Sequence, residues 1–223
     1  MIPATRFRAG RRRSVPPGDA EFISAASAAA TTLTLPAHQA GDLIVMCAGA
    51  RTNSASREIT LPAGWTSIRS ATFDGYQFST LRVAYKVAAS SGETSGTWTY
   101  AGGLTALVYR GLSVGASAIT ANASFSQGPV ARPTLAVGSG WALQLAVCTS
   151  GTGTPGVDDP TTAPDTLRGS TTITTSPNRA VVAVWDSDGP VGGTVATSSQ
   201  TFTSSGNRAA DGWGTVVVEL APT

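Results

Sequence analysis

A stretch from residue 41 to residue 112 constrains the fold of this chain more than any other feature. Its four strand-like segments are separated by clusters of Gly, Pro, Ser or Asn: GDLIVMCAGA (41–50), LPAGWTSIRSATF (61–73), LRVAYKVA (81–88) and LTALVYRGL (104–112). In the third segment apolar residues recur at every second position, as in a β-strand with one buried face. The first segment is apolar on both faces, which predicts a central strand covered on both sides.

The composition favours the same all-β interpretation. Charged residues make up 13% of the 223 residues, against about 25% in an average globular domain. Thr, Ser, Ala and Gly are abundant, and they suit short strands joined by tight turns. Segments 21–27, 31–36 and 97–100 are expected to be further short strands. In segment 31–36, Leu33 and Leu35 alternate with Thr.

The second part of the chain repeats this order of strand types. Each expected strand between 41 and 112, the short one at 97–100 included, has a counterpart in the same order. The counterparts are 138–151, 163–171, 179–189, 192–205 and 213–222. We therefore predict an antiparallel, jelly-roll-like β-sandwich body over 19–223, with pseudo-repeats at about 38–112 and 134–222. Two small sandwiches remain an alternative, but the linker is short and itself strand-like at 117–126, which favours one unit.

The N-terminus differs in charge from the body. Arg6, Arg8, Arg11, Arg12 and Arg13 stand in the first thirteen positions, and without them the formal charge falls from +2 to −3. Such a block of like charge is usually extended until it meets a partner. Pro16, Pro17 and Gly18 then form a linker. We interpret 1–18 as a basic arm that docks on another protein. A solvated tail is the second interpretation, and nucleic-acid binding is the least favoured.

The same N-terminal segment does not fit an export signal. Pro16, Pro17, Asp19 and Glu21 interrupt the region that would have to be apolar. The sequence also lacks an apolar run long enough to span a membrane. We therefore expect neither standard export nor a membrane span.

The strand motifs resemble those of a known module. GDLIV (41–45), PAGWT (62–66), YKVA (85–88) and ALVYRG (106–111) together resemble a β-sandwich module of tailed-bacteriophage virion proteins and prophage-encoded proteins. The resemblance extends over about 20–221 and is sharpest at 41–111. It implies a role in a minor tail protein, a tail fibre or a capsid-surface appendage, and it implies that Trp65 and Tyr109 pack in the core.

Residues suited to catalysis are scarce. His38 is the only histidine, and it stands in a turn before a strand. The sequence contains no nucleophile elbow, phosphate-binding loop or zinc-protease motif. Glycosidases need only two carboxylates, but most of the candidates here lie in turns, where such side chains usually cap the backbone. They are Asp74, Glu93, Asp158, Asp159, Asp165, Asp186 and Asp188. We predict that the chain is not an enzyme and needs no cofactor.

Two further features have a structural interpretation beside a functional one. Asp186, Asp188 and Gly189 look superficially like the start of a calcium loop, but Val195 stands where the closing Glu should be, so a plain turn is favoured. Cys47 and Cys148 occupy similar places in the two halves. A disulfide between them is conceivable, but proteins that fold in a reducing cytoplasm usually keep free thiols, which we favour.

Candidate ligand contacts are the polar and aromatic residues of the expected loop tips. They are Arg51, Asn53, Arg57, Tyr76 and Trp98. Tyr76 and Trp98 are the aromatic residues best placed to be exposed, as sugar stacking would require, although for Trp98 the core position is favoured.

The sequence therefore predicts a structural virion protein that is assembled in the bacterial cytoplasm, anchored to other tail or capsid proteins by its arm, and present as an oligomer or in many copies. A tail or fibre role in adhesion and a capsid decoration or head fibre both remain open. A glycan- or receptor-binding module is the alternative of another class, and a glycoside hydrolase is the least favoured.

Overall fold

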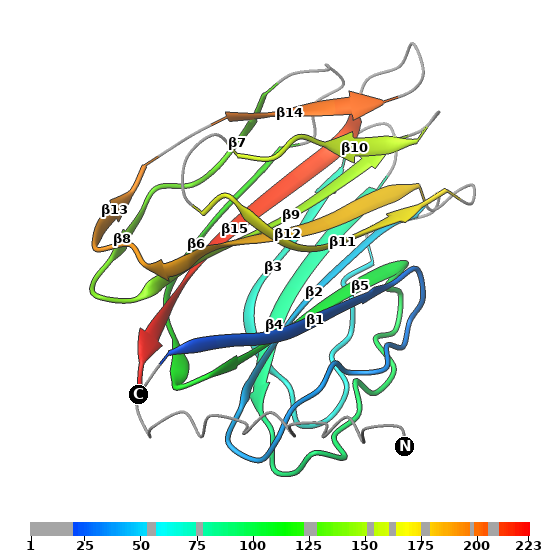
Figure 1. Cartoon of the computed structure of the whole chain (residues 1–223). Coiled ribbons are helices and arrows are strands. Elements are labelled where there is room, and N and C mark those ends of the chain that lie inside the picture. Colours follow the sequence, from blue (N-terminus) through cyan, green and yellow to red (C-terminus); the bar gives the residue numbers. More distant parts are fainter. Residues whose placement is uncertain are drawn as a thin grey trace, which may run out of the picture.

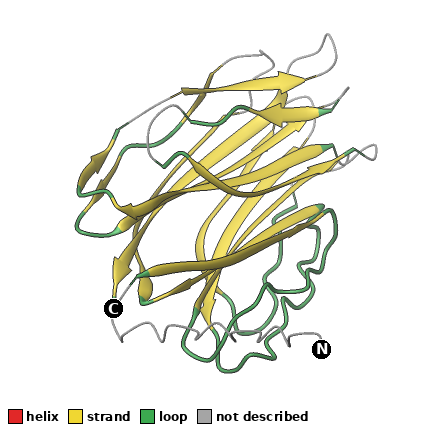
Figure 2. Ribbon diagram, in the orientation of Figure 1, coloured by secondary structure: helices red, strands yellow, loops and turns green. Residues whose placement is uncertain are grey.

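The computed structural model describes residues 20–52, 57–74, 78–122, 129–150, 154–160, 164–174, 179–196, 199–204 and 210–223. This part of the chain folds into β-strands joined by loops and turns, without a helix (Figure 2). Two large antiparallel sheets pack face to face (Figure 1). The prediction of an all-β antiparallel sandwich is therefore confirmed. A search of the described residues for a long apolar helix that could cross a membrane found none.

The first sheet uses the strands between residues 21 and 110. These strands are β1 (Glu21–Ala28), β2 (Leu43–Thr52), β3 (Thr66–Asp74), β4 (Phe78–Val87) and β5 (Gly103–Arg110). Their order in the sheet is β1-β5-β2-β4-β3, and every neighbouring pair is antiparallel. The central strand is β2, as its two apolar faces predict.

The second sheet uses the strands between residues 112 and 222. Its members are β6 (Leu112–Asn122), β9 (Trp141–Ser150), β11 (Thr166–Ile173), β12 (Ala180–Pro190) and β15 (Ala210–Pro222). Their order is β11-β12-β9-β15-β6. In both sheets the first strand lies at one edge beside the last strand, and the third long strand lies at the other edge. Two structurally equivalent halves would give this topology.

The main core lies between the two sheets. Along β2, Leu43, Val45 and Cys47 face the second sheet, whose strand β9 contributes Leu145 and Val147 to the same apolar cluster. The intervening residues of β2 point to the outer face of the first sheet, where they join a second cluster. Every second residue of a strand points the same way, so a strand without polar residues needs cover on both faces.

Loops provide the outer cover of the first sheet. Leu33, Leu35 and Ile59 pack there with the indole rings of Trp65 and Trp98. The prediction of strands at 31–36 and 97–100 was wrong, because these segments lie in loops apart from a single bridge between Thr60 and Thr99. An extended loop that lies across a sheet also buries every second side chain, so it imitates the alternation of a strand.

Five short strands provide the outer cover of the second sheet. They are β7 (Pro129–Ala131), β8 (Leu135–Val137), β10 (Pro155–Val157), β13 (Gly193–Val195) and β14 (Ser199–Ser204). They pair as β10-β14-β7 and β13-β8, and Figure 1 shows them as a thin additional layer beside β9, β12 and β15. Beneath this layer Trp185 and Trp213 are buried.

Candidate functional site

Several of the sequence-predicted site residues lie outside the described part of the chain. This applies to the five arginines of the predicted arm, to Asn53 and to Tyr76. The assignment of residues 1–18 as an anchoring arm therefore stays a prediction.

Two other candidate ligand contacts, Trp98 and Arg51, are buried, and for Trp98 this is the core position that the sequence favoured. A ligand contact at either residue stays a prediction. Trp98 has 0% of its surface exposed, and its ring packs edge-on against Trp65 with 5.1 Å between centroids. Arg51, at the end of β2, is 3% exposed. The loops that cover the first sheet enclose Trp98. Arg51 lies near the end of β2, where its packed neighbours leave the side chain little access to solvent.

Arg57 is the exposed member of the predicted set within the described residues. Its guanidinium lies 4.9 Å from the centre of the Tyr100 ring, an arrangement that favours cation–π attraction. Tyr100 is 44% exposed, and its φ of 71° lies in the left-handed region. Arg57 and Tyr100 form an exposed patch at a loop tip. Neither residue lines one of the two pockets described in this part of the chain.

The carboxylates that suggested a calcium loop are neutralised by an arginine. Asp186 is fully buried and accepts hydrogen bonds from Tyr109 Oη at 2.9 Å and from Arg168 Nε at 2.8 Å. Asp188 pairs with Arg168 Nη2. Burial acts to lower the pKa of Arg168, but the two carboxylates together raise it. The guanidinium of Arg168 thus neutralises both carboxylates. The plain-turn interpretation was wrong, because these residues belong to β12, at an irregularity of its pairing between Asp186 and Pro190.

Asp42, which was not among the candidates, and the candidate Asp159 also have structural partners. Asp42 receives a two-pronged contact from Arg110, with Nε–Oδ1 at 2.9 Å and Nη2–Oδ2 at 3.0 Å, and this contact is the main cause of the raised pKa of Arg110. Asp159 accepts the indole N–H of Trp185 at 2.7 Å. Within the described residues, no group of three or more His, Cys, Asp or Glu side chains is placed to hold a metal ion.

Both cysteines are free and buried. Cys47 lies in the core between the sheets, whereas Cys148 lies on the outer face of the second sheet with Val181 and Trp213. Cys47 is the fifth residue of β2 and Cys148 the eighth residue of β9. An odd difference in position along a strand moves a side chain to the opposite face. The favoured prediction of free thiols is confirmed. Burial raises the pKa of the Cys47 thiol.

A polar pocket lies between two loops on the outer side of the first sheet. It has a volume of about 510 Å³. One wall is residues 32–35 with His38, and the other is residues 91–97. Thr32, Thr34, Ser91, Thr94 and Thr97 bring hydroxyl groups to its rim, and their side chains are exposed.

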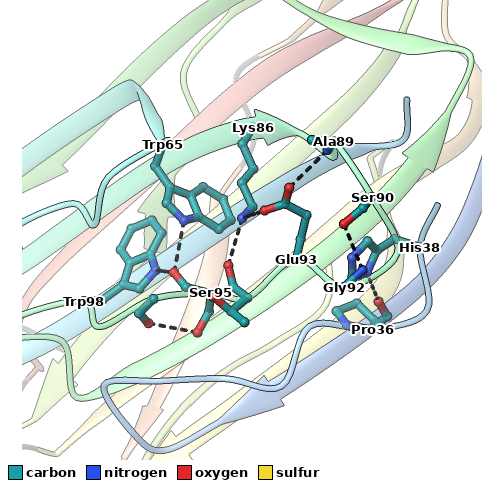
Figure 3. Close-up of polar contacts among 12 residues, drawn as sticks. Pro36, His38, Trp65, Lys86, Ala89, Ser90, Gly92, Glu93, Ser95 and Trp98 are labelled. Atoms are coloured by element: carbon teal, nitrogen blue, oxygen red, sulfur yellow. Dashed lines mark hydrogen bonds and ion pairs between the residues drawn. The ribbon is translucent and has the colours of Figure 1, made fainter. Parts of the chain in front are cut away.

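Buried aromatic residues hold one wall of this pocket in place (Figure 3). The carbonyl oxygen of Ser95 accepts the indole N–H of Trp65 at 3.0 Å and that of Trp98 at 3.1 Å. The Ser95 hydroxyl accepts the backbone N–H of Leu33 at 2.9 Å, which joins the two walls. A backbone hydrogen bond from the Trp98 N–H to the Thr31 carbonyl at 2.8 Å also joins the two loops.

An ion pair fixes the wall formed by residues 91–97 (Figure 3). Lys86 Nζ donates to the Glu93 carboxylate at 2.6 Å and to the Thr94 carbonyl at 2.8 Å. Glu93 also accepts the backbone N–H of Ala89 at 3.1 Å. The hydrogen bond from Lys86 is the main cause of the lowered pKa of Glu93, and the bond from Ala89 adds to it. Glu93 is therefore a carboxylate at neutral pH.

His38 is among the residues that line the pocket. Its Nδ1 lies 2.6 Å from the carbonyl oxygen of Pro36. A carbonyl can only accept, so Nδ1 donates this hydrogen bond. Nε2 is buried and has no hydrogen-bond partner among the described residues.

Little in the sequence indicates this pocket. The alternation of Leu33 and Leu35 with Thr predicts a strand, and the position of His38 predicts only a turn. The bond between Leu33 and Ser95 joins positions 62 residues apart. The one available signal is the polar run at 89–97, which is too long for a tight turn.

Comparisons with known proteins identify no relative. A scan against protein-family models, a search of curated proteins and a search of solved structures each returned no match.

Proposed function

We propose that the chain is a non-enzymatic structural component of a bacteriophage particle, present in many copies and anchored by its basic N-terminal arm. The sandwich projects from the particle in a tail, fibre or adhesion role, and capsid decoration or a head fibre is the alternative position. The observation that carries the proposal is that the motifs of the phage-module resemblance contact one another in the first sheet and its cover.

Two contacts join these motifs in pairs. Asp42 of the first motif binds Arg110 of the fourth. Lys86 of the third motif lies over the Trp65 ring of the second, 5.2 Å from its centroid. The glycines at 41, 64 and 111 all have positive φ, which other residues rarely adopt. The motifs thus form one folding frame, which supports a shared architectural role more than a shared reaction.

A second role, recognition of a host-surface glycan or receptor, is favoured by one observation. The pocket between the two loops combines hydroxyl groups, the carboxylate of Glu93 and the buried Nε2 of His38. Its walls are held in place by the hydrogen bonds of Ser95 and Lys86. This role is compatible with the first, because an exposed particle protein is well placed to meet the host surface.

Immunolabelling of purified particles tests the proposal. Antibodies against the recombinant chain are applied to particles purified by density gradient from a lysate of the source strain, and the same particles are analysed by mass spectrometry. We expect several copies of the chain per particle, with label at the tail or on the head surface. Detection of the chain only in the soluble lysate, with none in the particles, would contradict the proposal.

A further inference from the structure

We propose that the pocket lined by 32–35, His38 and 91–97 binds a neutral saccharide unit. This inference specifies the site and ligand class for the second role. It rests on that role and not on the anchoring role, so it can fail while the anchoring role holds.

The lining favours a ligand with many hydroxyl groups. Threonine and serine hydroxyls surround the rim, and each can donate or accept. Leu33 and Leu35 supply an apolar floor, against which the C–H face of a sugar ring can pack. The volume of about 510 Å³ lies within the range of about 300–1,000 Å³ that is usual for small-molecule pockets.

The charges in the pocket favour a neutral ligand. Glu93 is ionised, and its oxygens can accept sugar hydroxyls in addition to their present bonds. Lys86, the nearby cation, is engaged by Glu93 and the Thr94 carbonyl, and its side chain is 10% exposed. An anionic sugar would therefore meet a carboxylate without an available counter-charge.

His38 supplies a buried ring nitrogen, Nε2, that lacks a partner among the described residues. Leaving a buried polar atom unpaired costs about 1–3 kcal/mol, so a hydroxyl that reached Nε2 would recover part of that cost. Nε2 is covered in the structure, and the contact therefore requires a rotation of the imidazole that exchanges the Nδ1 contact with Pro36 for the ligand.

The walls are built before any ligand arrives, which reduces the entropy cost of binding. No Phe, Tyr or Trp is among the residues that line the pocket, since Trp65 and Trp98 pack in the apolar cluster behind the wall. We therefore expect weak binding per site, with a Kd on the order of 1 mM. Many copies on one particle would convert such weak sites into firm attachment.

NMR titration of the full chain tests this proposal. His38 is the only histidine, so its imidazole signals are unique reporters of the pocket. The probes are glucose, galactose, mannose, N-acetylglucosamine and rhamnose, with N-acetylneuraminic acid as the anionic comparison. We expect at least one neutral sugar to shift the imidazole signals in a saturable way, and the anionic sugar to leave them unchanged.

Variants that fill the pocket provide the control. Thr34→Arg and Thr97→Arg place a long side chain into the pocket from opposite walls, and Thr172→Arg adds the same side chain at an exposed position of β11. With melting temperatures matched, we expect Thr172→Arg to bind like wild type and both pocket variants to bind at least about tenfold more weakly, a change of about 1.4 kcal/mol. The proposal is wrong if none of the neutral sugars shifts His38, or if the pocket variants bind as wild type does.

Discussion

The Tyr109 hydroxyl bonds one sheet to the other through a fully buried carboxylate. Tyr109 belongs to β5 of the first sheet and Asp186 to β12 of the second. Arg168 neutralises Asp186 and stacks over Phe22 of β1, 4.1 Å from the ring centroid. Burial is the main cause of the raised pKa of Tyr109, and the neighbouring carboxylate adds to it. The network specifies how the sheets are positioned, because a buried charge tolerates few alternative partners.

Tyr109→Phe should destabilise the fold. The change removes one donor from buried Asp186, and the expected loss is about 1–3 kcal/mol in the free energy of unfolding. Urea unfolding of the variant measures it. Tyr85→Phe is the matched control, because Tyr85 packs beside the same core but is only partly buried; we expect a change within about 0.5 kcal/mol. Equal effects of the two substitutions would show that the inter-sheet hydrogen bond contributes nothing.

Glu93 should contribute stability that depends on pH. Its pKa in the folded protein is lowered from the ordinary value of 4.5, mainly by Lys86. A lowered carboxyl pKa stabilises the fold above the unfolded pKa, and the contribution disappears as the pH falls through the folded pKa.

The comparison of Glu93→Gln with wild type checks this contribution. We expect the variant to melt at a lower temperature at pH 7, and the two melting curves to converge as the pH falls below 4.5, the unperturbed pKa. Differential scanning calorimetry across this range measures the difference. A gap in melting temperature that stays constant down to the acid limit would contradict the ion-pair account.

At the scale of elements, the regular strands were predictable and the loop cover was not. At 81–87 apolar residues stand at every second position, and Leu81, Val83 and Tyr85 face the core as that pattern predicts. Val87, at the end of β4, is 59% exposed, and Ala84 on the opposite face is buried under the loops. The imperfect alternation at 65–70 corresponds to a bulge in β3 between Ser67 and Arg69. The segments that contain Trp98 and Leu33 were wrongly predicted to be strands, because the burial of both residues depends on contacts between distant loops. Local periodicity does not record such contacts.

On the edge strand β6, side chains bond two backbone groups. The Ala116 N–H donates to Glu219 at 3.3 Å, and the Ser117 carbonyl accepts from Arg69 at 2.6 Å. A backbone group that a side chain already binds is less available for pairing with another chain. Neither contact was predictable, because each joins residues from different strands far apart in the sequence.

Gly49 marks the closest approach of the two sheets. A Cβ atom there would lie 2.7 Å from Val147 Cγ1 and 2.8 Å from Val182 Cγ2. Gly49→Ala should therefore overpack the core and cost about 1–3 kcal/mol of stability. Chemical denaturation measures the cost against Gly92→Ala, where the nearest atom is Ser90 Oγ at 3.7 Å. Equal stability of the two variants would show that the sheets can separate without strain.

At the scale of the whole molecule, one sandwich is built from two halves, and each half forms one sheet. The order of strand types in the sequence predicts a correspondence between β2 and β9, β3 and β11, β4 and β12, and β5 and β15, and the strand orders of the two sheets are compatible with it. The pocket could not be anticipated in this way, because it belongs to the loop cover of the first sheet alone. The second sheet is covered by short strands instead.

Co-sedimentation with particles that lack this component tests the anchoring claim most directly. The full chain, a form without residues 1–18 and the Arg11, Arg12 and Arg13→Ala variant are compared, after their melting temperatures have been measured. The account predicts similar melting temperatures, pelleting of the full chain, loss of pelleting without the arm and weakened pelleting of the variant. Equal pelleting of all three forms, or a large loss of thermal stability without the arm, would contradict it.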